Sequence, residues 1–170
     1  IGSGAFVVAG VLVPLADDLG VSVPAAGQAM TAYALATALL APLAMLVTGR
    51  WTRRNAMVAA LLVFAAGNAV CALATSLPAL LAGRVLMGLG AVFTPLAAGI
   101  AVALVEPALR GRALSRVFLG MSLSYVIGVP LGSWLGLAYG WHTPIWLIAT
   151  LGLVAAGLVA GGTAAGGPGA

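Results

Sequence analysis

Few side chains in this sequence could take part in acid–base or ligand chemistry. The 170 residues include three acidic residues, seven arginines, one histidine and one cysteine, and no lysine. Arg84 stands alone in a long apolar run, while Asp17 and Asp18 follow a shorter one. A buried arginine suits an anionic or hydroxyl-rich ligand, and a carboxylate within a membrane could carry a proton. We find no nucleophile–base pair, phosphate-binding loop or cysteine cluster, and therefore expect no enzyme, no cofactor and no metal site.

Each of these residues also has a simpler interpretation. Arg84 lies about six residues, or roughly 9 Å, into its apolar run, so its side chain could reach the lipid headgroups instead of a ligand. Asp17 and Asp18 lie at the end of a run, where carboxylates commonly terminate helices and are solvated. Glu106, beside Pro107 and near three arginines, is expected to form local ion pairs. His142 is a candidate pH sensor or an ordinary loop histidine.

The composition predicts an all-α protein embedded in a membrane. Hydrophobic residues make up 63% of the chain and charged residues only 6%, against about a quarter charged in soluble proteins. The segments 56–83, 85–105 and 117–141 carry no charge, and each is near or above the roughly 20 residues that cross a bilayer as a helix. The net charge of +4 comes from arginines that flank these segments, which indicates membrane topology and not nucleic-acid binding.

Apolar runs and turn residues together predict six spans, with helix starts expected at Ser22 and Pro78. The first is short for a bilayer, and we expect it to be cut at its N-terminal end. We predict a six-helix bundle over residues 1–160, compatible with a three-plus-three repeat, and a flexible Gly/Ala linker or tail over 161–170. The predicted spans are 1–15, 25–48, 56–74, 78–104, 113–137 and 144–161.

Six arginines fall in two clusters, and these predict the orientation. The clusters lie in every second predicted connection, and the other connections carry no arginine. The positive-inside rule then places both clusters and both termini in the cytoplasm. We expect the membrane to be a bacterial inner (plasma) membrane. The clusters are Arg50, Arg53 and Arg54, and Arg110, Arg112 and Arg116.

Small residues recur every four positions along the fifth predicted span. They form one helix face on which another helix backbone could approach closely, and Pro130 within it should bend the helix or free a carbonyl. The face could serve ordinary packing within the bundle or a sliding interface. Its residues are Gly120, Ser124, Gly128, Gly132 and Gly136.

Aromatic residues fall into two groups. Trp134, Tyr139, Trp141 and Trp146 lie near the outer end of the last hairpin, where we expect an interfacial aromatic belt. Tyr33 and Phe93 lie inside predicted spans and are candidates for lining a cavity.

Several segments in the right order resemble one transporter family. Residues 128–136 (GVPLGSWLG) and 140–149 resemble the fifth and sixth helices of the major facilitator superfamily, in its drug:proton antiporter and arabinose-efflux-permease-like branch. Residues 83–90 (GRVLMGLG) resemble its fourth-helix motif, and 6–33 its first two helices. The resemblance covers the chain to about residue 160. It implies the N-terminal half of a twelve-helix transporter with alternating access.

In this family the second and fifth helices face the other half, and the resemblance therefore makes the small-residue face a gating interface. Arg50, Arg53 and Arg54 match a gating loop. The position that is usually acidic in this loop holds Gly49 here, and the position that is usually glycine holds Thr52. The loop therefore lacks the carboxylate that would form an ionic latch to the other half. The fourth-helix motif has Met87 where Gln is common, and Ala5 stands where many relatives have the first-helix acid.

These features predict a secondary transporter for drugs, sugars or related small metabolites, with proton-driven efflux. The partners expected are the lipid bilayer, a small-molecule substrate, protons, and a C-terminal half or a second copy of this chain. The alternatives are a six-helix scaffold or oligomerisation module, and a small-solute channel. Asp17 and Asp18 are the coupling candidates within the chain, and a coupling carboxylate could otherwise lie in missing N-terminal residues or in a second half.

Overall fold

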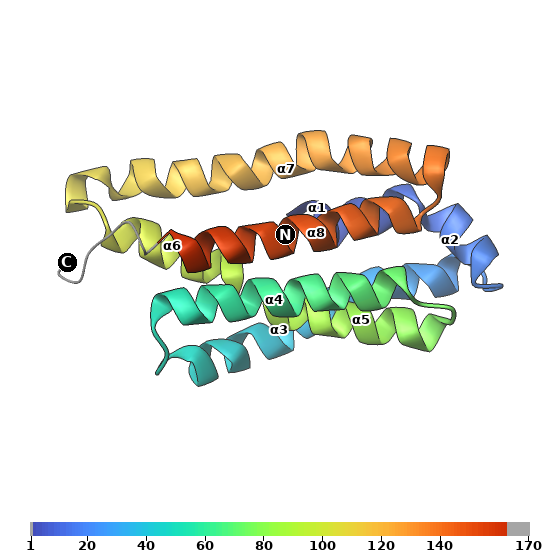
Figure 1. The fold of residues 1–170 in the computed structure, drawn as a ribbon, viewed down its shortest axis with the longest axis horizontal. Helices are drawn as coiled ribbons and strands as arrows, with labels where there is room; N and C mark the ends of the chain where they lie inside the picture. Colours follow the sequence, from blue (N-terminus) through green and yellow to red (C-terminus); the bar gives the residue numbers. More distant parts are fainter. Residues whose placement is uncertain (1, 163–170) are drawn as a thin grey trace.

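The computed structural model describes residues 2–162, and in this range the chain is a bundle of helices that run roughly side by side (Figure 1). Some of the helices follow each other within one crossing of the bundle. In chain order the helices are α1 (Gly2–Gly10), α2 (Leu12–Asp18), α3 (Val23–Thr48), α4 (Arg53–Ala72), α5 (Leu77–Gly90), α6 (Phe93–Ala103), the 3₁₀ helix η1 (Pro107–Leu109), α7 (Arg110–Tyr139) and α8 (His142–Gly161). Residues 163–170 of the predicted tail lie outside the described range.

Five segments are long and apolar enough to cross a membrane. They correspond to the second through sixth spans predicted from the sequence. The first predicted span, which was expected to be short, is divided into two helices, α1 and α2, and is not among these segments. The five segments are Val23–Thr48, Arg53–Ala72, Leu77–Ala103, Pro107–Tyr139 and His142–Gly161.

The break between α1 and α2 has a local cause. Pro14 has no amide hydrogen, so the carbonyl of Gly10 loses its usual helical donor. Val11 leaves helical geometry at φ −121° and ψ 19°. Its amide donates to the carbonyl of Val8 at 3.2 Å, a tighter turn than the α-helix uses.

The fourth predicted span is also divided, into α5 and α6. Ala91 and Val92 form the break, and Pro95 cannot donate to the carbonyl of Ala91. The amide of Thr94 donates to that carbonyl instead, at 3.2 Å. By contrast, α7 stays helical through Pro130.

The predicted helix starts at Ser22 and Pro78 are confirmed. Ser22 caps α3 by accepting a hydrogen bond from the amide of Ala25 at 3.3 Å, and Pro78 lies in the first turn of α5. Asp17 and Asp18 complete the last turn of α2 and are exposed, as expected of carboxylates that end a helix. The chain reverses after them, at Gly20, whose φ of +63° favours glycine.

Glycines allow α4 and α5 to approach backbone to backbone. A Cβ on Gly67 would lie 2.8 Å from the carbonyl oxygen of Gly83, and a Cβ on Gly83 would lie 2.9 Å from the amide nitrogen of Cys71. A Cβ on Gly90 would meet the amide of Phe64 at 2.8 Å. Close van der Waals packing of this kind stabilises helix pairs in lipid, where apolar burial gives no advantage.

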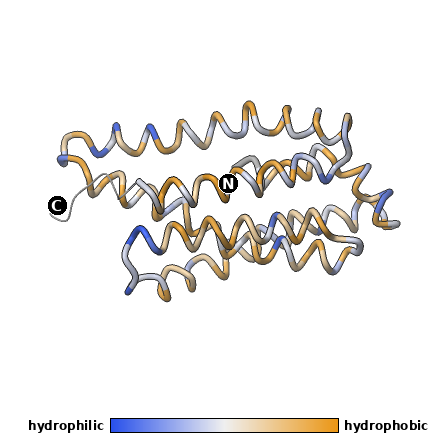
Figure 2. Tube along the Cα trace, in the orientation of Figure 1, coloured by the Kyte–Doolittle hydropathy of each residue, from blue (hydrophilic) through white to orange (hydrophobic). Residues whose placement is uncertain are grey.

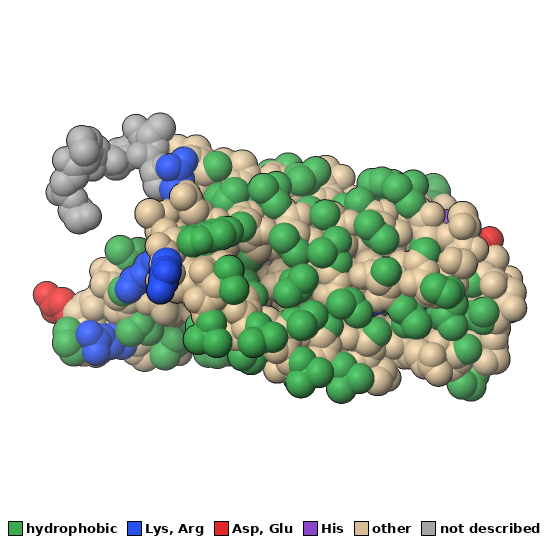
Figure 3. Space-filling model, turned by 90° about the horizontal axis from the view of Figure 1, so that it is seen from below, with side chains coloured by type: hydrophobic (Ala, Val, Ile, Leu, Met, Phe, Trp, Pro, Cys, Tyr) green, Lys and Arg blue, Asp and Glu red, His purple; other side chains and the backbone are tan. Residues whose placement is uncertain are grey.

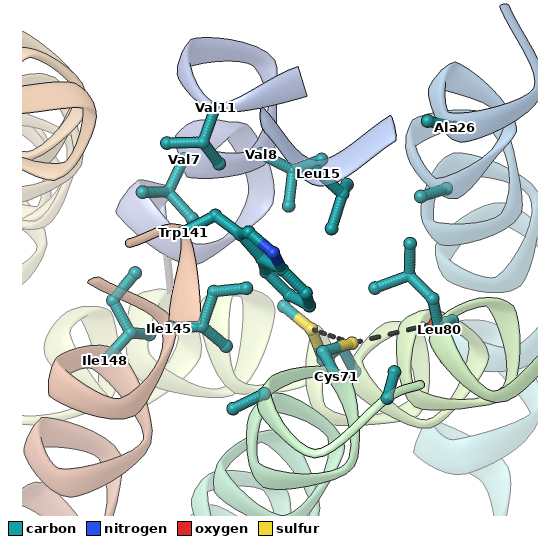
Figure 4. Close-up of a cluster of buried hydrophobic side chains, with 14 of the residues drawn as sticks. Val7, Val8, Val11, Leu15, Ala26, Cys71, Leu80, Trp141, Ile145 and Ile148 are labelled. Atoms are coloured by element: carbon teal, nitrogen blue, oxygen red, sulfur yellow. Dashed lines mark hydrogen bonds between the residues drawn. The ribbon is translucent and has the colours of Figure 1, made fainter. Parts of the chain in front are cut away.

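The best-buried part of the bundle lies where α1 to α5 and α8 meet. Figure 4 shows the ring of Trp141, at the start of α8, reaching toward Cys71 and Leu80, with Val7 and Val8 on its other side. The Cys71 thiol lies 3.6 Å from the carbonyl of Leu80. Most of the strongly hydrophilic residues lie toward the two ends of the bundle, and the stretches between them are mainly apolar (Figure 2).

Candidate functional site

Arg84 is buried inside the bundle, midway along α5. Only 1% of its surface is exposed. Its Nη1 donates to the carbonyl oxygen of Gly4 in α1 at 3.0 Å, and its Nε has no hydrogen-bond partner among the described residues. The guanidinium therefore points inward, and the alternative of a side chain reaching the lipid headgroups is wrong.

No carboxylate neutralises this cation in the part of the chain that the structure describes. Asp17 and Asp18 lie in the last turn of α2, and Glu106 precedes η1, so all three acidic residues lie at the ends of spanning segments. The electrostatic neighbours of Arg84 are Tyr33 and Cys71. The site is thus a buried, incompletely hydrogen-bonded cation beside a phenol and a thiol, suited to binding an acceptor group.

Tyr33 also lines a hollow on the α1–α3 side of the bundle. The hollow has a volume of about 580 Å³, and Phe6, Thr31 and Thr37 contribute to its wall. The ring of Phe6 meets that of Tyr125 in α7 edge to face, with centroids 5.4 Å apart. The hollow is therefore mostly apolar and aromatic, with a few hydroxyl groups.

Phe93, the other cavity candidate, lines two different hollows. One of about 180 Å³ lies against Phe64 of α4 and Ile148 of α8. The other, of about 250 Å³, lies against Gly120 and Ser124 of α7. Phe93 and Tyr33 are thus both next to cavities, but they do not share one of these hollows.

The small-residue face of α7 divides into two parts. Gly132 and Gly136 are buried, and a Cβ on each would lie 2.4 Å from Val7 and 2.2 Å from Val11, respectively. These two glycines pack on α1 and the segment after it, within this bundle. Gly120 is exposed with open space around it, Ser124 and Gly128 are half-buried, and Pro130 is exposed. A contact of the face with another half stays a prediction.

Six arginines lie at one end of the bundle. Figure 3 shows arginine side chains (blue) gathered at that end of one face, whereas the histidine lies toward the opposite end. Arg50 and Arg53 are exposed at the turn between α3 and α4. Arg54 donates a hydrogen bond to the carbonyl of Ala160, near the end of α8. The separation of arginine-bearing from arginine-free connections predicted from the sequence is therefore present in the fold.

The end opposite the arginines holds a contact that the sequence did not predict. Trp134, Tyr139 and Trp146 are 59%, 68% and 43% exposed, but Trp141 is only 3% exposed. Its inclusion in an aromatic belt is wrong, because its indole Nε1 donates to the carboxylate of Asp18 at 3.1 Å and its ring fills the core. His142 stacks on Trp141, with ring centroids 3.6 Å apart.

The sequence profile of the Major Facilitator Superfamily matches residues 1–163, nearly the whole chain. The chain belongs to this superfamily. It is 40% identical over 156 residues to the chloramphenicol resistance protein of Streptomyces lividans, a stretch covering 91% of this chain and 40% of that protein. It is 37% identical over 138 residues to a chloramphenicol efflux pump of Mycobacterium tuberculosis, covering 78% of this chain and 32% of the pump.

Similarity extends to the inner membrane transport protein YdhP of Escherichia coli strain K12, at 32% identity over 91% of this chain and 40% of YdhP. The chain spans about two fifths of the length of the relatives that it matches over most of its own length. Membership in the superfamily and the five long apolar segments make this chain an integral membrane protein.

Sequence reasoning missed three contacts of this site. The carbonyl of Gly4 as the Arg84 partner leaves no sequence signal, because every residue has a carbonyl. The pairing of Phe6 with Tyr125 joins distant helices, and only the family resemblance drew attention to Phe6. The bond from Trp141 to Asp18 could have been suspected, since both residues lie at the same predicted end of the bundle.

Proposed function

We propose that this chain is the N-terminal half of a major facilitator transporter that exports drugs, sugars or related small metabolites by alternating access. The observation that carries the proposal is the family match over residues 1–163. The names of two relatives, which describe chloramphenicol resistance and efflux, support export as the direction. The chain's task is movement of a substrate and not its chemical conversion.

Arg84, Tyr33 and Phe6 are our candidates for the substrate-facing part of this half. Arg84 offers a cation and an unpartnered Nε to an acceptor group, and the Tyr33 hollow offers aromatic and apolar surface with two threonine hydroxyl groups. Binding pockets for small molecules commonly combine apolar walls with a few fixed polar groups. This combination suits a largely apolar molecule that carries hydroxyl, carbonyl or anionic groups.

Proton coupling is part of the proposal, with the coupling carboxylate outside the spans of this chain. Asp17 and Asp18 end α2, and Asp18 already accepts a bond from Trp141. Protonation of a carboxylate within the membrane is the simplest means of coupling transport to a proton gradient. Arg84 would then respond to the protonation state of a carboxylate supplied by the partner half.

The proposed location is a bacterial inner membrane with both termini in the cytoplasm. Clustering of six arginines at one end of the bundle supports this orientation. In a Cys71→Ala background, a cysteine at Thr52 should react with a membrane-impermeant thiol reagent only after the cells are opened. A cysteine at Ser76 should react in intact spheroplasts, and the reverse pattern would refute the orientation.

Transport in proteoliposomes tests the function. The chain is reconstituted alone and together with a C-terminal half, and uptake of radiolabelled chloramphenicol is followed after an imposed pH gradient. Saturable, gradient-dependent counterflow supports a carrier. Flux that does not saturate would identify a channel, and no flux even with the partner half and a panel of sugars and drugs would leave a scaffold.

A further inference from the structure

An apolar groove runs along the outside of the bundle between α3, α4 and α5, at the end that carries the arginines. Its volume is about 410 Å³ and its exposed lining is wholly apolar. Leu43 and Val47 of α3 line one side and are more than half exposed. Ala59 and Val63 of α4 line the other side. The groove is open to its surroundings along the bundle.

The end of this groove lies at the turn between α3 and α4. Thr48 and Trp51 belong to the groove wall, and Arg50 lies between them in the chain. Arg50 and Arg53 are exposed, and neither has an ion pair or hydrogen bond recorded within residues 2–162. Arg54 differs, because it is bonded to the carbonyl of Ala160. The guanidinium groups of Arg50 and Arg53 and the half-exposed indole of Trp51 therefore lie where the apolar groove ends.

We infer that this groove binds one anionic phospholipid, with an acyl chain along α3 and α4 and the phosphate against Arg50 and Arg53. Charge complementarity selects the headgroup, because Gly49 stands at the acidic position of the matched loop and no acidic residue lies in the turn. Juxtamembrane arginines attract anionic lipids, and tryptophan favours the headgroup level.

The lining favours a lipid over an extended peptide. The backbone N–H and C=O groups of an extended segment would need partners at this depth, and the exposed wall of the groove offers none. A hydrocarbon chain has no such requirement. A soluble phosphate would use the two arginines and leave the groove unused. This inference stands apart from the proposed transport activity, since it concerns the groove between α3 and α4 and not Arg84.

Native mass spectrometry of the purified chain in a neutral detergent tests the inference. The probes are a phosphatidylglycerol and a phosphatidylcholine with identical acyl chains. We expect phosphatidylglycerol to be retained preferentially, and Arg50→Gln with Arg53→Gln to weaken it about thirtyfold, since each juxtamembrane arginine contributes on the order of a factor of five. The matched control, Arg110→Gln with Arg112→Gln, removes the same charge at the same end and should change retention less than twofold.

Two further variants separate the groove from the arginines. Ala59→Phe fills the groove with both arginines intact and should reduce phosphatidylglycerol retention, whereas Arg50→Lys with Arg53→Lys should keep most of it and shows that the turn still folds. Equal losses in the two glutamine pairs would overturn the inference in favour of general surface attraction. Normal binding to Ala59→Phe, or displacement by free glycerol phosphate at equal concentration, would overturn it in favour of a soluble-anion site.

Discussion

The Nη1 of Arg84 lies 3.0 Å from the carbonyl oxygen of Gly4, which joins α5 to α1 across 80 positions of sequence. This close approach needs glycine, because a Cβ at position 4 would lie 2.6 Å from the ring of Phe64. A guanidinium has five N–H donors, and the one carbonyl satisfies only one of them. A cation left so incompletely bonded inside the bundle is better explained by a ligand or a mobile partner than by stability.

The first prediction concerns Arg84→Met. Replacing a buried charge by an apolar residue of similar length is often neutral or stabilising, so we expect the chain to insert normally and its melting temperature to stay the same or rise. Transport by the complete transporter should fall about tenfold or more, because a bond to a charged group contributes roughly 1.5 to 3 kcal/mol. Thermal unfolding in detergent and proteoliposome flux measure the two effects.

Arg116→Met is the matched control, because Arg116 is exposed near the start of α7, and it should leave the flux unchanged. Arg84→Lys adds a test of the guanidinium itself, since lysine keeps the charge but lacks the planar fork of donors. Full transport by the Arg84→Met variant would mean that Arg84 is not part of the functional site.

The second prediction separates the two parts of the α7 face. Gly136→Leu should destabilise this chain by about 1 to 3 kcal/mol through overpacking, because a Cβ there already meets Val11 at 2.2 Å. Val11→Ala should restore part of the loss. Gly120→Leu should leave the stability of the isolated chain unchanged, since nothing surrounds that Cβ. Thermal unfolding in detergent tests each variant.

If Gly120 belongs to a contact with the other half, Gly120→Leu should lower co-purification of the two halves and transport while the isolated chain stays stable. Normal association would restrict the α7 face to packing within this bundle.

The contacts of α7 and those of the α4–α5 pair could be predicted from the sequence to different extents. Charge-free runs, Pro78 and Ser22 were sufficient to predict the spans and two helix starts, because these signals are local. The four-residue spacing on α7 was visible, but not which helix it meets, since this depends on how distant helices pack. A close backbone approach lies instead at Gly67 and Gly83, which are only two of the 24 glycines in the chain. Because glycines are frequent along the whole chain, the sequence did not single out this contact.

The burial of Arg84 could not be predicted from the sequence, for a related reason. Its depth along the helix followed from counting residues, but whether it faced lipid or the interior depends on the rotation of α5. Gly88 helps to set that rotation, because a Cβ there would lie 2.9 Å from the amide of Thr37 in α3. Composition alone contains no such information.

The third prediction uses Cys71 as a reporter of the α4–α5 contact. Cys71 is fully buried and is the only cysteine, so a small maleimide should label the native chain slowly and the denatured chain fast. Gly83→Val should speed labelling of the native chain at least about tenfold, because the added side chain would meet the Cys71 thiol and separate the helices. Gly157→Val, in open space on α8, is the control and should label slowly. Equal rates for the two variants would refute the close contact.

The fourth prediction concerns the bond from Trp141 to Asp18, which holds the end of α2 against the start of α8. Trp141→Phe keeps an aromatic ring but removes the donor, and we expect a loss of about 1 to 3 kcal/mol from the missing bond and the reduced volume. Asp18→Asn keeps an oxygen acceptor without the charge, and its loss should be smaller. Trp146→Phe is the control for tryptophan removal, because its side chain is 43% exposed, and its melting temperature should stay close to that of the original chain.

A double variant decides whether the two side chains act on each other. If the bond accounts for the loss, Trp141→Phe should cost less in an Asp18→Ala background, which removes the acceptor, than in the original chain, by about 1 kcal/mol of coupling. Additive losses would mean that Trp141 stabilises the bundle by filling the space beside Cys71 and Leu80, with no contribution from Asp18. The end opposite the arginines would then be held by packing alone, and removing the Asp18 carboxylate should leave the stability of the bundle unchanged.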